Sequence, residues 1–393
     1  MILSRIRRAI ISTTLTSRDL QINEALKKTK NAIAIGLIIT FLAIGLINPQ
    51  NKLLQENISK IEGIIYDLRL NATLPDTPRK SSHNIFIVDI DEKALEEVGR
   101  WPWSRATISR MVEQLKEAGV VVVGFDVVFS EPEINPVDTL IDADALNHLS
   151  KSKLAELRLK LDADTQFAQT IADYDVVLGG LLQHDKSVDV GTLKPSPIVM
   201  LDPKAVRISS MHFAGKVANV EVLQEAAISQ GFFNSVPDVD GAIRRAALVF
   251  EHNGVLYPSL SIEIARVYEL ADEVFVETKP SEGFEGAHDI SAIKFGTKRR
   301  IKTDSFGRVL IPYRGGQKSF PYYSATDILH GRIAPELLEG GVALVGTSAV
   351  GIADLRKPQS VFNTQGLKYT PMWLRVCLIP SCLSTVRYFG KVP

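Results

Sequence analysis

The sequence predicts an α/β fold: an extracytoplasmic mixed sheet with flanking helices, preceded by one N-terminal transmembrane helix. Two observations support the domain and one supports the anchor. The segment 106–118 has apolar residues at helical spacing and ends at Gly119. An uncharged apolar run occupies 31–48. Continuous apolar, largely β-branched runs are typical of strands covered on both faces, and they occur at 85–88, 120–123 and 342–345.

The N-terminal residues have the features of a membrane anchor. Residues 1–30 are basic, with Asp19 and Glu24 as their only acidic side chains, and we expect them to form a cytoplasmic leader. The uncharged run predicts a transmembrane helix at 31–49, slightly short against the ~20 residues that a span requires. A signal peptide and a buried soluble helix are the alternatives. The excess of Lys and Arg before the span predicts a single-span protein whose chain is extracytoplasmic after Pro49.

Residues 50–80 follow as a stalk helix and linker. Apolar residues continue at helical spacing as far as Leu70, which predicts a stalk packed either on the domain or on its copy in a homodimer. The segment 75–82, which is rich in Pro and Ser, is typical of a linker into the first strand.

The domain itself is expected at 81–360. Strand, helix and strand at 85–123 form a βαβ unit, whose crossover is nearly always right-handed. The region 138–174 is polar and helical, and we interpret it as an insertion that packs over the sheet edge. A third buried strand is predicted at 176–182, and 185–230 is predicted to be mostly loop. A helix is expected at 257–270. The remaining strands are expected at 245–250, 292–295, 300–302 and 309–312.

Composition excludes several classes of function. Lys plus Arg and Asp plus Glu both number 45, so no net field attracts nucleic acid, and no nucleic-acid partner is expected. The two cysteines, Cys377 and Cys382, lie near the C-terminus, and there is no CxxC pair, HExxH helix, Walker loop or GxGxxG turn. No cofactor is predicted, and the question of a metal stays open.

Carboxylates follow the strands of the βαβ unit and form the candidate site. Ligands of such sheets usually bind beyond the carboxyl ends of the strands, where we expect carboxylates at adjacent strand ends to converge on a cation or polar ligand. The alternative is structural: they cap the helix, bond loop amides or pair with Arg100, Arg105 or Arg244. The candidate ligand-binding residues of this unit are Asp89, Asp91, Asp126 and Glu131.

Three further motifs have a functional and a structural interpretation. Asp238 and Asp240 resemble a calcium loop faintly and complete the candidate ligand-binding set, but Gly241 beside them favours a tight turn. Trp101 and Trp103 stack a ligand or, as is commoner for such residues, plug the core. Ser348, near His330 or Asp354, lacks the GxSxG elbow of a nucleophile, so no catalytic residue is predicted.

A succession of motifs now supports a resemblance. EVGRWPWSR at 97–105 follows Asp89, FDVVFSEP stands at 125–132, PDVDGAIRR at 237–245 and VGTSA at 345–349. In this order they resemble the CHASE sensory domain of the second type, over about residues 66–356. The resemblance implies an extracytoplasmic sensor of a bacterial inner-membrane receptor that binds a ligand not named by the sequence. In such receptors further spans precede an adenylate or guanylate cyclase, a histidine kinase, a protein kinase or a diguanylate cyclase.

The function predicted on this basis is that of an input module and not of an enzyme. A truncated receptor cyclase is the first expectation, and the kinases and the diguanylate cyclase are alternatives. A dimerising ectodomain without a ligand is a further alternative. An extracytoplasmic enzyme would need a paired base and nucleophile, which the sequence does not display.

The chain departs from the family pattern after Arg356. The possible codons of 364–373, read two bases later, permit the family's expected text, which continues as PGVEIHANV. We therefore expect a frameshift near Asn363 and interpret 361–393 as an out-of-frame tail. No functional inference is drawn from that tail.

Overall fold

The computed structural model describes residues 30, 33–41, 52–73 and 84–349, the last range without 147, 206, 283–284, 298 and 314–318. The chain divides into two units, Met1–Arg69 and Leu70–Pro393. The predicted linker at 75–82 and the predicted tail at 361–393 lie outside the described residues.

The first unit contains helical residues at 33–41 and most of helix α2, Lys52–Thr73. Helix α2 confirms that the stalk is helical and carries it three residues beyond the predicted Leu70. Within the described parts of the chain, no helix is both long and apolar enough to cross a membrane. The predicted span at 31–49 lies only partly inside these parts, so it stays a prediction.

The second unit is built on a mixed sheet, which confirms the α/β fold class with flanking helices. Its strand order is β17-β1-β18-β2-β3-β8-β4, and β9 also pairs with β3. The strands from β17 to β3, together with β9, are parallel, whereas β8 is antiparallel to β3. Their bounds are β1 Ile85–Ile90, β2 Val122–Phe125, β3 Val176–Gln183, β4 Asp189–Val190, β8 Gly215–Val217, β9 Ser229–Phe232, β17 Tyr322–Ser324 and β18 Val342–Thr347.

Strand β18 separates the two strands of the βαβ unit. It pairs in parallel with β1 on one side and with β2 on the other, so β1 and β2 are not neighbours. The expectation of adjacent strand ends is therefore wrong. β18 lies more than 200 residues later in the chain, so the sequence around β1 and β2 does not indicate that it inserts between them.

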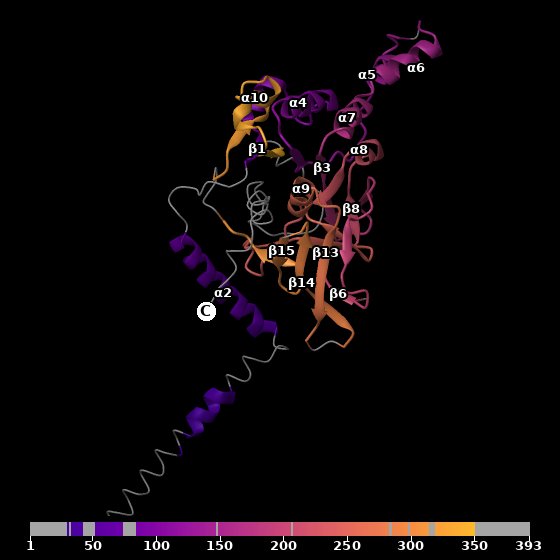
Figure 1. Cartoon of the computed structure of the whole chain (residues 1–393). Helices are drawn as coiled ribbons and strands as arrows, with labels where there is room; N and C mark the ends of the chain where they lie inside the picture. The colour runs from indigo at the N-terminus through magenta and orange to yellow at the C-terminus, as the bar shows by residue number, and fades with distance from the viewer. Residues whose placement is uncertain are drawn as a thin grey trace, which may run out of the picture. The chain divides into compact units, whose positions relative to one another are not determined.

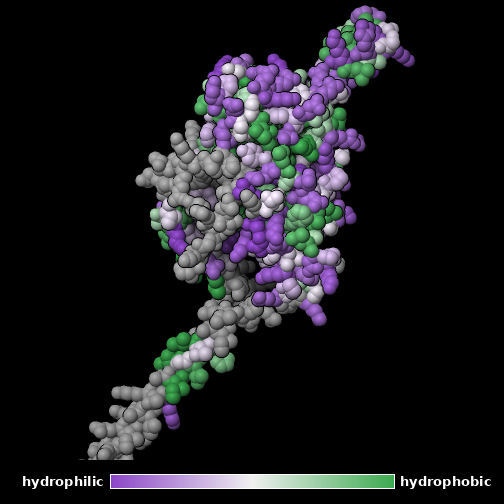
Figure 2. All heavy atoms as spheres, in the orientation of Figure 1, coloured by the Kyte–Doolittle hydropathy of each residue, from purple (hydrophilic) through white to green (hydrophobic). Residues whose placement is uncertain are grey.

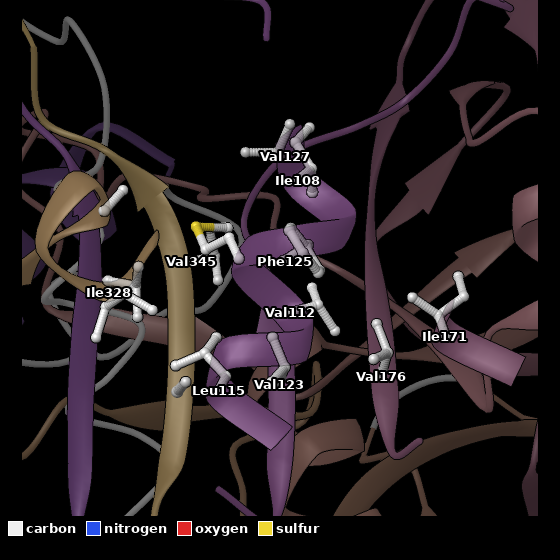
Figure 3. Close-up of a cluster of buried hydrophobic side chains, with 14 of the residues drawn as sticks. Ile108, Val112, Leu115, Val123, Phe125, Val127, Ile171, Val176, Ile328 and Val345 are labelled. Atoms are coloured by element: carbon white, nitrogen blue, oxygen red, sulfur yellow. The ribbon is translucent and has the colours of Figure 1, made fainter. Parts of the chain in front are cut away.

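Helices cover one face of this sheet with the cluster shown in Figure 3. Helix α4, Arg105–Glu117, places Ile108, Val112 and Leu115 against Val123 and Phe125 of β2. Ser104 caps its N-terminus by accepting from the amide of Ala106 at 3.2 Å, and the predicted end near Gly119 is confirmed. The other helices of this layer are α3 Glu92–Val98, α7 Ala163–Ala172, α8 Glu221–Ala226 and α10 Ala325–Leu329.

The opposite face packs on helix α9, Leu260–Tyr268, and on a second sheet. A Cβ at Gly124 of β2 would lie 2.2 Å from Cδ1 of Ile264, so a larger residue there would force the Ile264 side chain of α9 to move. The second sheet has the order β15-β14-β13-β5, with β6 on β14. Its strands are β5 Ile198–Met200, β6 Arg207–Ser209, β13 Val274–Pro280, β14 Ala287–Phe295 and β15 Arg299–Lys302.

Several predicted elements differ in extent from the observed ones. The predicted loop at 185–230 contains six short strands, from β4 to β9, and α8. The predicted strand 245–250 is two strands, because residues 245–247 pair with 308–310, whereas residues 249–252 pair with 255–258. The first residues of the predicted helix 257–270 belong instead to a β-hairpin. The smaller sheets consist of β7 His212–Phe213, β11 Val249–His252 and β12 Val255–Pro258, and of β10 Arg245–Ala247 with β16 Arg308–Leu310.

The insertion at 138–174 packs on the domain through α7, whose Phe167 and Ile171 are buried, and through Tyr174, whose hydroxyl donates to the Val120 carbonyl at 2.6 Å. Helices α5, Pro136–Asp142, and α6, Lys151–Lys160, project from the end of α7 (Figure 1). Hydrophobic and hydrophilic side chains stand side by side on this projection (Figure 2). The expectation that the insertion lies over the sheet edge is thus wrong for α6, because this helix is apolar on no single side and buries no residue.

Candidate functional site

The candidate site lies at the carboxyl ends of β1, β18 and β2. Asp89 of β1 is level with Gly346 of β18, and Asp126, directly after β2, bonds the Val345 carbonyl through its amide at 2.8 Å. Residues that are paired across a parallel sheet point to the same face of the sheet. The side chains of Asp89 and Asp126 therefore lie on the face that also carries Ile87. Gly346 between them has no side chain. Their Cα atoms are therefore separated by two strand spacings, about 10 Å.

Asp89 is a buried carboxylate, 7% exposed, that is bonded to the loop after β18. Its Oδ1 accepts from the backbone amide of Ser348 at 2.9 Å, and its Oδ2 accepts from the Ser348 hydroxyl at 2.6 Å. Burial raises the pKa of Asp89, and these two hydrogen bonds only partly oppose the rise. Among the described residues, no Lys or Arg forms an ion pair with Asp89.

Asp91 performs the structural role that was the alternative to ligand binding. It is the N-cap of α3, where its Oδ1 accepts from the Ala94 amide at 2.9 Å and from the Ser324 hydroxyl at 2.7 Å. Its carboxylate thus joins β1 to the neighbouring β17 and is committed to these donors.

Asp126 and Glu131 occupy different environments, although both follow β2. Asp126 is buried, at 8% exposed, whereas Glu131 is exposed to solvent. The backbone carbonyl of Glu131, and not its carboxylate, accepts a hydrogen bond from Nη2 of Arg105 at 2.8 Å. Of the four carboxylates predicted in the βαβ unit, only Asp89 and Asp126 are therefore both buried and in register across β1, β18 and β2.

Sequence reasoning missed the carboxylates that hold Arg105. Nε of Arg105 donates to Asp164 of α7 at 3.1 Å, and both side chains are about nine-tenths buried. The carboxylate of Glu133 accepts from the Arg105 amide at 2.6 Å, and the Glu133 amide donates to Asp164 at 2.7 Å. This network fastens α4 and α7 to the segment after β2. Nothing in the sequence near Arg105 indicates Asp164, because the contact is made only when α7 packs on α4.

Asp238 and Asp240 form a turn that two arginines close. Arg244 donates from Nη1 and Nη2 to the two carboxylate oxygens of Asp240, each at 2.8 Å, and Arg245 donates to Asp238 at 2.8 Å. Gly241 has a φ of 86°, and its amide bonds the Asp238 carbonyl at 2.8 Å, as in the predicted tight turn. The hydrogen bonds from Arg244 lower the pKa of Asp240 to about 2.

The two tryptophans lie in the packed helical layer. Trp103 is 4% exposed, and its Nε1 donates to the Gly99 carbonyl at 2.8 Å. The ring of Trp101 meets it edge to face, with ring centroids 5.7 Å apart. This arrangement agrees with the packing interpretation of the motif.

Among the described residues, no group of side chains could hold a metal ion, and Ser348 does not pair with His330. In that part of the chain, no three His, Cys, Asp or Glu side chains are grouped so that they could hold a metal ion. Ser348 donates to Asp89, whereas Nδ1 of His330 lies 2.8 Å from the Thr326 carbonyl. Asp354 lies outside the described residues.

Comparison with known proteins identifies the class. The CHASE2 domain matches residues 35–370, so the chain belongs to the CHASE2 family, as the motifs at 97–105 and 345–349 predicted. CHASE2 domains are extracytoplasmic sensory domains of signalling receptors. Neither the curated proteins nor the solved structures gave a match.

Proposed function

We propose that this chain is the extracytoplasmic input module of a bacterial transmembrane receptor. The observation that carries the proposal is the CHASE2 match, which covers most of the chain and begins at residue 35, inside the predicted span. An input module transmits a signal when its ligand binds one conformation better than another and so biases the connected segments.

We place the ligand at the buried carboxyl ends of β1 and β2. Asp89 and Asp126 flank Gly346, which has no side chain. All three lie at the carboxyl ends of the strands, where ligands of parallel sheets usually bind. A cationic or hydrogen-bond-donating small molecule is the chemical class that two buried carboxylates recognise. Asp91 caps a helix, Asp238 and Asp240 are held by arginines, and Glu131 is exposed, so we give these four no direct ligand contact.

A ligand screen tests this assignment. The full chain, purified in detergent, is screened by thermal shift against amines, amino acids and divalent cations. We expect a compound that raises the melting temperature of the wild type and loses its effect in Asp126→Asn. The control is Asp91→Asn, because Asn is as good an N-cap as Asp and should leave the ligand shift unchanged. An Asp126→Asn protein that is destabilised by ~1–3 kcal/mol and responds like the wild type would contradict the site.

We further propose that residues 31–49 anchor the module in the inner membrane, with the domain outside. The basic leader supports this topology through the positive-inside rule. In a variant without native cysteines, a cysteine at exposed Lys186 should react with an impermeant reagent added to intact cells, whereas one at Ser12 should not. Labelling only at Ser12 would invert the topology.

The output of the parent receptor is proposed from the family alone. A nucleotide cyclase ranks first, and a histidine kinase, a protein kinase or a diguanylate cyclase are alternatives. We also propose that the module acts as a homodimer, and the exposed face of α2 is the specific observation that favours this partner.

A further inference from the structure

Helix α2 presents an apolar face to solvent. In the described part of its side chains, Ile61 is 57% exposed, Ile64 56%, Ile65 50% and Leu68 65%. These residues recur at intervals of three and four, so they lie on one side of the helix. A soluble helix normally buries such a stripe against another element. The stripe therefore requires an occupant.

The spacing of the stripe indicates which occupant fits. Leu54, Ile58, Ile61, Ile65 and Leu68 are separated alternately by four and three residues. This is the a and d pattern of a coiled coil, in which a second helix runs alongside at a small crossing angle. Positions a are Ile58, Ile65 and Ala72, and positions d are Leu54, Ile61 and Leu68.

We propose that α2 forms a parallel two-stranded coiled coil with α2 of a second copy of this chain. Ile at two of the three a positions, combined with Leu at two of the three d positions, favours the parallel dimer. Gly63 occupies position f, on the outside of such a pair, where a missing side chain removes nothing from the interface. The proposal rests on the proposed function in one respect, because a shared membrane makes the two helices emerge in the same direction.

The charges of α2 favour a second helix over a lipid surface. The helix contains Lys52, Lys60 and Arg69 against Glu56, Glu62 and Asp67, so its polar side has no net charge. Helices that lie on membranes are typically rich in Lys and Arg on that side. At the flanking e and g positions of a parallel pair, Asn57 meets Glu62 and Ile64 meets Arg69, so no like charges oppose each other.

The length of α2 is consistent with a tethered pair. Its 22 residues correspond to about 33 Å and about three heptads, which is short for a coiled coil that must assemble from solution. Anchoring in one membrane raises the effective concentration of the two helices without any added contact. The pairing would hold the two sensor domains of a receptor close to the point where each chain leaves the membrane.

Disulfide cross-linking in native membranes tests the proposal. In the full chain with Cys377→Ser and Cys382→Ser, single cysteines are placed at Ile61 and Leu68, at the d positions. The matched controls are Lys60→Cys, one residue away at c, and Leu70→Cys, which replaces the same residue type at f. After mild oxidation, we expect covalent dimers from Ile61→Cys and Leu68→Cys in severalfold greater yield than from the controls.

The relative yields of covalent dimer at the four positions decide whether the coiled coil forms. Equal yields at all four positions, or higher yields at Lys60 and Leu70, would overturn it, and so would the absence of dimers at Ile61 and Leu68. Loss of protein from the membrane would be detected separately by the amount of each variant. Dimers at Ile61 and Leu68 without external labelling of Lys186→Cys would retain the coiled coil and remove the receptor proposal. External labelling of Lys186→Cys without such dimers would retain the receptor proposal and overturn the coiled coil.

Discussion

Asp89 lies in the apolar strand β1 and Asp240 lies in the turn before β10, and their surroundings shift their pKa values in opposite directions. At Asp89 burial is the largest influence and raises the pKa, although Ser348 donates two hydrogen bonds. At Asp240 the hydrogen bonds from Arg244 are the largest influence, and they lower the pKa to about 2. One carboxylate is partnered by neutral donors and the other by a guanidinium.

The difference indicates which acidic region is available to a ligand. In the Asp238–Asp240 turn, the arginines already supply the charge and the hydrogen bonds that a cationic ligand would bring. At the end of β1, ionised Asp89 has no ion-pair partner among the described residues, so a cationic ligand would gain an interaction there. The comparison therefore separates an arginine-closed turn from the proposed binding edge.

The largest expected effect comes from opening the arginine-closed turn. Arg244→Met should lower the free energy of unfolding by about 1–3 kcal/mol, because it removes a buried guanidinium and leaves the partly exposed carboxylates of Asp238 and Asp240 without its hydrogen bonds. The side chain of Arg244 is 7% exposed. Arg245→Met is the control: its side chain is 37% exposed, and its loss should cost at most about 1 kcal/mol. Urea unfolding measures both values, and equal effects would show that the turn is not closed by Arg244.

A smaller loss of stability is expected when the pH is lowered, because Asp240 becomes protonated. Because the pKa of Asp240 is lowered in the folded chain, its stabilising contribution is complete above the usual value of 3.8 and is lost as the pH falls toward about 2. The wild type should therefore lose its advantage over Asp240→Asn between pH 4 and pH 2. Urea midpoints of the two proteins across this range measure the change. A constant difference between them would remove the ion pair from the explanation.

The smallest expected effect is a change of stability with pH at Asp89, and its sign is opposite to that at Asp240. Because the pKa of Asp89 is raised on folding, its contribution to stability is complete below the usual value of 3.8 and declines as the pH rises through the folded value. Asp89→Asn does not titrate, so its stability relative to the wild type should improve between pH 4 and pH 7. Calorimetry at several pH values measures this trend.

Ser348→Ala sharpens the same test. It removes a hydrogen bond that favours the ionised form of Asp89, so the pH dependence of the otherwise wild-type chain should become steeper. A flat profile in both backgrounds would mean that burial does not govern this carboxylate, and the contrast with Asp240 would disappear.

Local sequence was sufficient for the elements that depend on local physics. The apolar run at 85–88 became β1, and the helical spacing before Gly119 became α4, because periodic apolar residues select both the element and its buried face. The tight turn at Gly241 followed from residue type, since its φ of 86° is favourable for glycine. The order of motifs between residues 97 and 349 was also sufficient to indicate the family.

Tertiary structure alone decided which of these elements meet. β18 enters between β1 and β2, Asp164 reaches Arg105 from α7, and Ser348 rather than an arginine bonds Asp89. Each of these contacts joins residues that are 59 or more positions apart. Their formation depends on the packing of whole layers, and a residue's immediate sequence does not encode which distant partner that packing brings to it.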